Sequence, residues 1–143
     1  MNVPLVIAGS LALLGAAIHG GVGDFFVVRP LSLNVLPGTP FGGPRLTKLM
    51  IRATWHITTI AFVTVGCALL FSGTVLTGDS ARALGLLSAF ASSGFAAIVL
   101  AAVISQARTV QRSTKRRDLR AALLHPGPLM LTTVAVLAWV GVS

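Results

Sequence analysis

The feature that most constrains this chain is a set of four long windows that contain no charged residue. Asp, Glu, Lys and Arg are absent over 23, 26, 25 and 23 residues, in 1–23, 53–78, 83–107 and 121–143. A helix needs about 20 mostly apolar residues to cross a bilayer, because its backbone polar groups must be satisfied within the segment. Four such windows in 143 residues leave no room for a water-soluble domain. The sequence therefore predicts an all-α, integral membrane four-helix bundle.

The composition and the connecting segments agree with this prediction. Only 10% of the residues are charged and 55% are hydrophobic, whereas soluble domains contain about 25% charged residues. Four prolines in segment 29–48 predict an irregular cytoplasmic loop, since proline lacks the amide donor that a helix needs. Segment 107–122 is a basic connector without Gly or Pro, into which the third helix can continue. We place four spans in one membrane domain, 1–143, at 3–28, 49–72, 81–106 and 123–142.

The basic residues lie almost entirely on one side of these spans. Ten of the eleven Lys and Arg residues belong to 24–52 or 108–120, and only Arg82 lies beside the second connection. By the positive-inside rule, the first and third connections are cytoplasmic and both termini lie on the non-cytoplasmic side. The net charge of +8 then favours contact with anionic lipids and not with nucleic acid, which requires a basic face on a folded domain.

Small residues recur at helical spacing in the first and third spans. In a bilayer, helices associate by close packing of small side chains, because lipid provides little hydrophobic drive between them. Such stripes fit packing within one chain, a homodimer or docking onto a larger membrane complex. The two stripes are Ala8, Ala12, Ala16 and Gly20, and Gly85, Ala89, Ser92, Ser93, Ala96 and Ala97.

Three histidines, His19, His56 and His125, fall in the cytoplasmic half of three different spans. Ionisable groups at this depth usually face a cavity or a partner instead of lipid. The functional hypothesis is a pocket of His19, His56 and Arg52 that binds haem b or a quinone-like ligand. All three histidines together could instead hold a transition metal. The structural alternative is interhelical hydrogen bonding, with His125 at the end of the fourth helix.

Other polar residues surround this candidate pocket. Arg52 lies one turn before His56 and can equally pair with Asp24 across the contact between the first two helices. On a regular helix Asp24 is too far from His19 to bond it well, although the glycines between them allow a distortion. Arg29 fits an interfacial arginine at the exit of the first helix, and Trp55 precedes His56.

The order of these motifs resembles a group of small bacterial four-span membrane proteins. His19 is followed by Arg29-Pro30-Leu31, then by Trp55-His56 and Thr58-Thr59. The resemblance covers most of the chain and implies a four-helix bundle in a bacterial inner membrane. It implies no activity.

Three functions remain open at this stage. We favour a structural or accessory subunit of a membrane assembly, in which the small-residue stripes and basic loops dock onto a partner. The alternative is a redox component that uses the histidine pocket. A further alternative is a small dimeric transporter; since the chain has no Glu, proton coupling would fall to Asp24 or a histidine. An enzyme is not favoured, because no nucleophile and base are recognisable.

Overall fold

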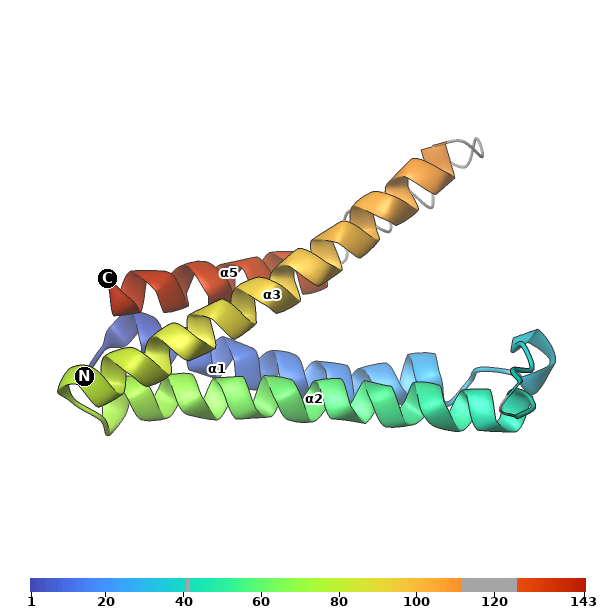
Figure 1. The fold of residues 1–143 in the computed structure, drawn as a ribbon, viewed down its shortest axis with the longest axis horizontal. Coiled ribbons are helices and arrows are strands. Elements are labelled where there is room, and N and C mark those ends of the chain that lie inside the picture. Colours follow the sequence, from blue (N-terminus) through green and yellow to red (C-terminus); the bar gives the residue numbers. More distant parts are fainter. Residues whose placement is uncertain (41, 112–125) are drawn as a thin grey trace. The chain divides into compact units, whose positions relative to one another are not determined.

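The computed structural model describes residues 1–40, 42–111 and 126–143 (Figure 1). The chain is an all-α four-helix bundle with three long apolar helices and a shorter one, as the charge-free windows predicted. One isolated bridge, between Thr39 and Gly42, lies in a loop. The elements are α1 (Val3–Ala17), the π-helix η1 (Ile18–Val28), the 3-10 turn η2 (Leu33–Val35), α2 (Pro44–Thr74), α3 (Gly78–Gln111) and α5 (Pro126–Val142).

Three helical segments are long and apolar enough to cross a membrane. They are Val3–Val28, Pro44–Thr74 and Gly78–Gln106, and each contains an 18-residue apolar window, with mean hydropathies of 1.9, 1.8 and 2.1. The fourth apolar helix, α5, has 17 residues. Large side chains that an aqueous domain would bury are exposed, for example Leu129 at 74%. The protein is therefore a multi-span membrane protein.

Two helices extend beyond the spans that the sequence suggested. α2 begins at Pro44, inside the segment 29–48 that we assigned to a loop, since proline suits the first turn of a helix. Its 31 residues measure about 46 Å, well above the hydrocarbon thickness of about 30 Å. α3 continues to Gln111, into the basic connector. The rest of that connector, 112–122, lies outside the described residues.

The chain divides into two compact units, which we describe separately. Residues 1–12 and 65–143 form the four-helix unit, and residues 13–64 form the hairpin unit.

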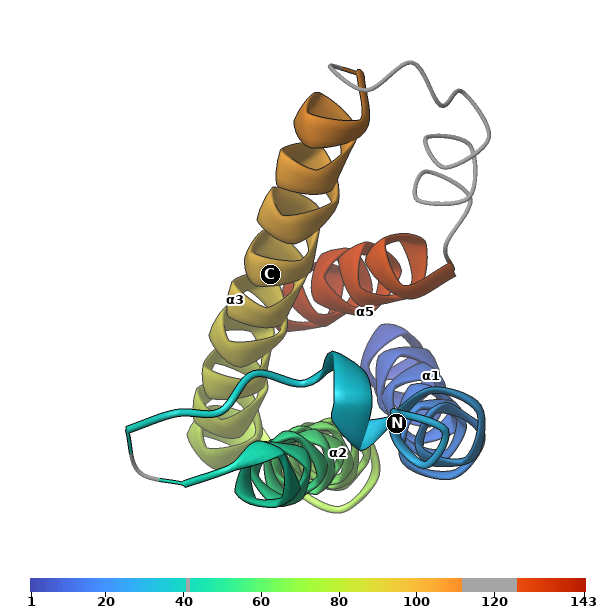
Figure 2. The ribbon, with the colours of Figure 1, turned by 90° about the vertical axis from the view of Figure 1, so that its right-hand side faces the viewer.

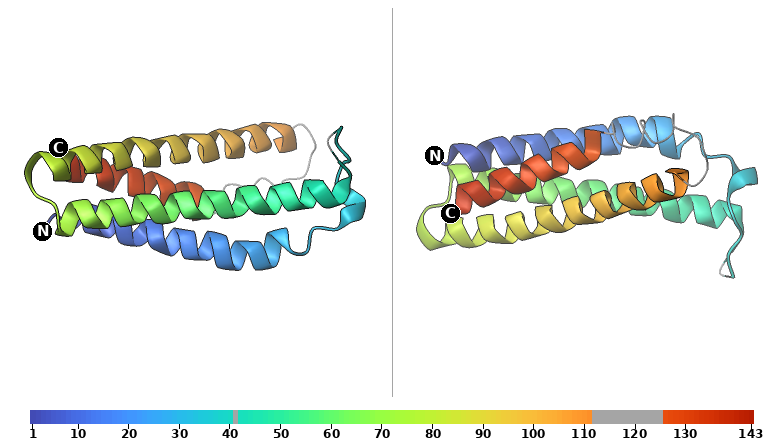
Figure 3. Two further views of the ribbon diagram at one scale, coloured as in Figure 1. Left: turned by 60° about the horizontal axis from the view of Figure 1, so that its bottom comes forward. Right: turned by 90° about the horizontal axis from the view of Figure 1, so that it is seen from above.

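The four-helix unit is built around small side chains. Ala8 of α1, Ala89 of α3 and Ala138 of α5 are fully buried, and they pack with Leu69 of α2 in one core. α3 and α5 lie side by side and run antiparallel (Figure 3). Their contact includes a hydrogen bond of 3.0 Å from Trp139 Nε1 to Ser93 Oγ. Ala8 and Ala89, members of the two small-residue stripes, are thus used within the chain.

Both termini lie at one end of the four-helix unit, beside the turn between α2 and α3 (Figure 1). The backbone N–H of Asn2 donates to Gly73 O at 2.8 Å, and Asn2 Nδ2 donates to Gly141 O at 2.6 Å. Gly78 opens α3 with a φ of +60°, a conformation that permits the tight reversal after α2. These bonds tie the start of α1 to the ends of α2 and α5.

The hairpin unit contains η1, the loop 29–43 and the first part of α2. Figure 2 shows the path of this loop between η1 and α2. The loop is fastened to α2 by side chains. Lys48 Nζ donates to the carbonyl oxygens of Arg29 and Leu31 at 2.9 and 2.8 Å. Thr47 Oγ1 donates to Pro37 O at 2.8 Å. The loop is therefore held against the first turns of α2.

Close backbone packing in the four-helix unit generates a testable prediction. A methyl group at Gly9 would lie 2.8 Å from Gly66 O and 2.9 Å from the backbone nitrogen of Leu70. Backbone atoms of a packed helix cannot move aside cheaply, so Gly9→Ala should lower the free energy of unfolding by about 1–3 kcal/mol. Thermal unfolding in mild detergent measures this loss.

The matched control is Gly94→Ala, because no atom outside the local helix lies within 4 Å of that position. Alanine favours a helix over glycine, so this variant should unfold at or slightly above the wild-type temperature. Equal unfolding temperatures for the two variants would contradict the close contact at Gly9.

Candidate functional site

The hairpin unit departs from regular helix geometry where its polar residues lie. Ile18–Val28 is a π-helix of 11 residues, and the N–H of Arg29 donates to Asp24 O, five residues earlier, at 2.9 Å. The wider turn of a π-helix brings residues five apart close to one face, whereas on an α-helix, with 3.6 residues per turn, they lie on different faces. His19, Asp24 and Arg29 are spaced five apart and therefore share one face. This is the distortion of the glycine-containing turn that the sequence left open.

Two glycines of the π-helix allow α2 to approach closely. A methyl group at Gly20 would lie 2.5 Å from Thr59 Cγ2, and one at Gly23 would lie 2.5 Å from Trp55 Cζ2. At either position an added Cβ would force a side chain of α2 to move, so the missing Cβ atoms let the face that carries His19 and Asp24 approach α2 closely. Long π-helices are rare, and π segments are frequent at functional sites.

His19 lies in an aromatic environment. Its ring stacks on that of Trp55, with centroids 4.1 Å apart and planes inclined by 9°, and it meets the Phe62 ring edge-on at 5.6 Å. Trp55 Nε1 donates a hydrogen bond of 2.8 Å to the backbone oxygen of His19. Among the described residues, His19 Nε2 is buried and has no hydrogen-bond partner. The stacking and the indole hydrogen bond fix His19 against α2.

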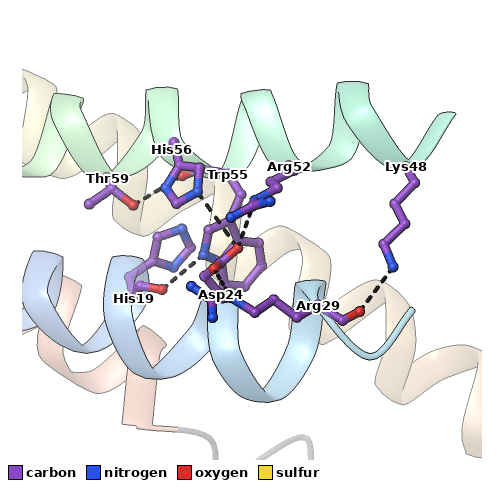
Figure 4. A network of polar contacts seen from close by, with 8 residues as sticks. All are labelled: His19, Asp24, Arg29, Lys48, Arg52, Trp55, His56 and Thr59. Carbon is purple, nitrogen blue, oxygen red and sulfur yellow. Dashed lines mark hydrogen bonds and ion pairs between the residues drawn. The ribbon is translucent and has the colours of Figure 1, made fainter. Parts of the chain in front are cut away.

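Asp24 lies at the centre of a charged cluster (Figure 4), which we call the Asp24 cluster: Asp24, Arg29, Arg52 and His56. The residue is only 2% exposed. Arg29 Nε donates to its Oδ2 at 2.7 Å. Its Oδ1 lies 3.4 Å from Arg52 Nε and 3.6 Å from His56 Nε2, and it accepts no hydrogen bond within the described residues. Arg29 at the end of η1, and Arg52 and His56 of α2, thus surround one carboxylate inside a candidate membrane span.

The structure brings together some of the candidate site residues and separates others. Arg52 lies beside Asp24, one of the two pairings that the sequence allowed. His56 lies in the same cluster, but His19 stacks on Trp55 instead of joining it. No group of three His, Cys, Asp or Glu side chains suited to a metal occurs in the described part of the chain. His125 lies outside the described residues.

Sequence reasoning missed the contact between Arg29 and Asp24. We treated Arg29 as an interfacial arginine and did not pair it with Asp24; its Nε makes the shortest ion pair of the cluster, at 2.7 Å. The available signal was the spacing of five residues that relates His19, Asp24 and Arg29. That spacing indicates a shared helix face only if the segment is a π-helix. On an α-helix the same residues lie on different faces.

An open apolar groove adjoins His19 on the side of Trp55. Its volume is about 770 Å³. Arg52 and His56 do not line it, so the three residues of the expected cofactor pocket do not border one cavity. The described residues that line it are His19, Thr39, Leu46, Thr47, Met50, Ile51, Thr54, Trp55 and Thr58.

Comparisons with known proteins give no match for this chain. No model of a protein family, no curated protein and no solved structure matches the sequence.

The Asp24 cluster predicts that removing its arginines destabilises the protein more when the Asp24 carboxylate remains than when it is also removed. The double variant Arg29→Gln/Arg52→Gln leaves a buried carboxylate with only His56 beside it. Removing the partners of a buried charge costs about 3–5 kcal/mol, so this variant should unfold at a much lower temperature than the wild type. Thermal unfolding in detergent, followed by circular dichroism, is the measurement.

The control is the triple variant that adds Asp24→Asn. Asparagine is neutral and similar in shape, so the triple variant should recover a large part of the lost stability. Recovery would identify the uncompensated carboxylate as the cause. A triple variant no more stable than the double variant would show that the arginines act by some other contact.

Proposed function

We propose that this chain is a four-span protein of a bacterial inner membrane that serves as a structural or accessory subunit of a membrane assembly. The observation that carries the proposal is the compensation of the buried Asp24 carboxylate by groups of its own hairpin unit. A carboxylate held by two guanidinium groups stabilises a helix contact. It is poorly suited to bind and release protons during transport.

The surface of the first span supports the same proposal. Along η1, Phe25 is 57% exposed, Phe26 70% and Val27 52%. These side chains form an apolar surface beside the internally paired polar face, and such a surface suits lipid or a helix of a partner. The partner is a second copy of this chain or another membrane protein. Of the residues of the bacterial resemblance, His19 and Arg29 belong to this polar face, and Trp55 of α2 packs against it.

The proposal includes four crossings with both termini outside the cytoplasm. At about 1.5 Å per residue, the 17 residues of α5 measure about 25 Å, near the hydrocarbon thickness. Both termini lie at the end of the four-helix unit that carries the α2–α3 turn. Arg82 is the one basic residue near that turn, against ten around the other connections.

Reporter fusions test this topology. Alkaline phosphatase is active only outside the cytoplasm. Green fluorescent protein that is exported in an unfolded state does not become fluorescent outside the cytoplasm. A fusion after Ser143 should therefore give phosphatase activity and no fluorescence. Insertion of each reporter after Gly43, in the cytoplasmic loop, should give the opposite pair of results. Fluorescence from the fusion at Ser143 would contradict the proposed orientation.

The accessory role predicts a larger native assembly. Membranes of the native host, solubilised in mild detergent, should release the tagged protein at a size well above that of its 14.7 kDa chain with bound detergent. Native electrophoresis followed by a denaturing second dimension measures this. A protein that migrates as a detergent-bound monomer under every mild condition would contradict the proposal.

A cofactor-binding role is the second candidate, and the groove beside His19 is the observation that favours it. The aromatic and apolar lining suits a flat lipophilic ligand such as a quinone. An absorption spectrum with metal analysis separates the two functions. The accessory role predicts a colourless, metal-free protein, whereas a reducible Soret band or a bound quinone lost in His19→Ala would establish the second candidate.

A further inference from the structure

The Asp24 cluster carries more positive charge than its own carboxylate neutralises. Asp24 contributes one negative charge, and Arg29 and Arg52 each contribute a permanent positive charge. The cluster keeps a net charge of at least +1 even with His56 neutral. An uncompensated charge next to apolar segments favours an anionic ligand.

The two guanidinium groups present unused donors. Both arginines turn Nε toward Asp24, at 2.7 Å from Oδ2 and 3.4 Å from Oδ1. Within the described residues, no hydrogen bond engages their terminal NH₂ groups. The side chains are 58% and 50% exposed, whereas that of Asp24 is 4% exposed. The buried carboxylate therefore positions two arginines and leaves their outer donors open to the surroundings.

The cluster lies where lipid headgroups are expected. Arg29 follows Val28, the last residue of the first candidate span, and begins the loop 29–43. Lys48 Nζ binds the carbonyl oxygens of Arg29 and Leu31, which places a third cation beside the same boundary. Arg52 lies about 12 Å along α2 from Pro44, a depth from which a long side chain reaches the interface.

We propose that Arg29 and Arg52, positioned by Asp24, form a binding site for a phosphate group. The planar fork of a guanidinium matches two phosphate oxygens, and charge-assisted hydrogen bonds of this kind are among the strongest in proteins. The phosphate belongs to an anionic phospholipid or is free phosphate in solution. The site differs from the groove beside His19 and does not depend on the accessory role.

The test uses the full chain, purified in detergent and analysed by native mass spectrometry. The probes are phosphatidylglycerol, phosphatidylcholine and inorganic phosphate, each added separately. We expect phosphatidylglycerol to bind in preference to phosphatidylcholine, with Arg29→Gln and Arg52→Gln each weakening it about tenfold or more. Arg108→Gln is the charge-matched control, because Arg108 is an exposed arginine of α3 outside the cluster, and it should bind like the wild type.

The inorganic phosphate arm separates the two sources. Arginine-dependent binding of inorganic phosphate without a preference among the lipids supports the site with free phosphate as its ligand. Arginine-dependent binding of phosphatidylglycerol alone supports the site with lipid as its ligand. Equal loss in Arg108→Gln and Arg52→Gln would overturn the proposal, since it would indicate a general effect of charge. Equal binding of all three probes by wild type and variants would overturn it as well.

A second variant distinguishes a loss of phosphate binding from a loss of folding. Arg52→Lys keeps the charge beside Asp24 but removes the fork, so it should fold like the wild type and still bind phosphatidylglycerol more weakly. Size-exclusion chromatography and circular dichroism check the fold of each variant. A folded Arg52→Lys protein with unchanged affinity would show that the guanidinium fork does not bind the phosphate.

Discussion

The structure of the hairpin unit depends on the burial of one carboxylate in an apolar segment. Asp24 is 2% exposed within a candidate membrane span, and an isolated charge there would be very unfavourable. Its partners must come from nearby elements, and Arg29, Arg52 and His56 provide them. This requirement joins the end of the π-helix to α2 and determines which faces of the two segments meet.

The π-helix and the glycines serve this contact together. A spacing of five residues aligns His19, Asp24 and Arg29 only where the helix widens, and the missing Cβ atoms of Gly20 and Gly23 make room for α2. The four-helix unit follows a simpler rule, in which small side chains allow close helix packing and the core formed by its described residues is apolar. One membrane protein thus uses two kinds of helix contact, one polar and one apolar.

These contacts also indicate what the site is suited to do. Its carboxylate is occupied by cations of the same hairpin unit, and its histidines have different partners. Such an arrangement supports the proposed structural role, in which the hairpin unit is a stable scaffold. The arginines keep donors on their outer side, and the excess positive charge lies where the chain leaves the first span. A scaffold of this kind can hold a particular lipid at its boundary while its apolar surfaces meet other membrane components.

The sequence by itself determined the class of fold, because charge-free windows of this length are stable only as helices in a bilayer. It also identified Asp24, Arg52 and His56 as candidate residues. Only the tertiary structure decided their grouping. The π-helix changes the periodicity on which sequence reasoning depends, so Arg29 meets Asp24 and His19 meets Trp55. The local sequence is compatible with an α-helix or a π-helix. Packing against α2 favours the π-helix, in which the buried Asp24 carboxylate contacts Arg29 and Arg52.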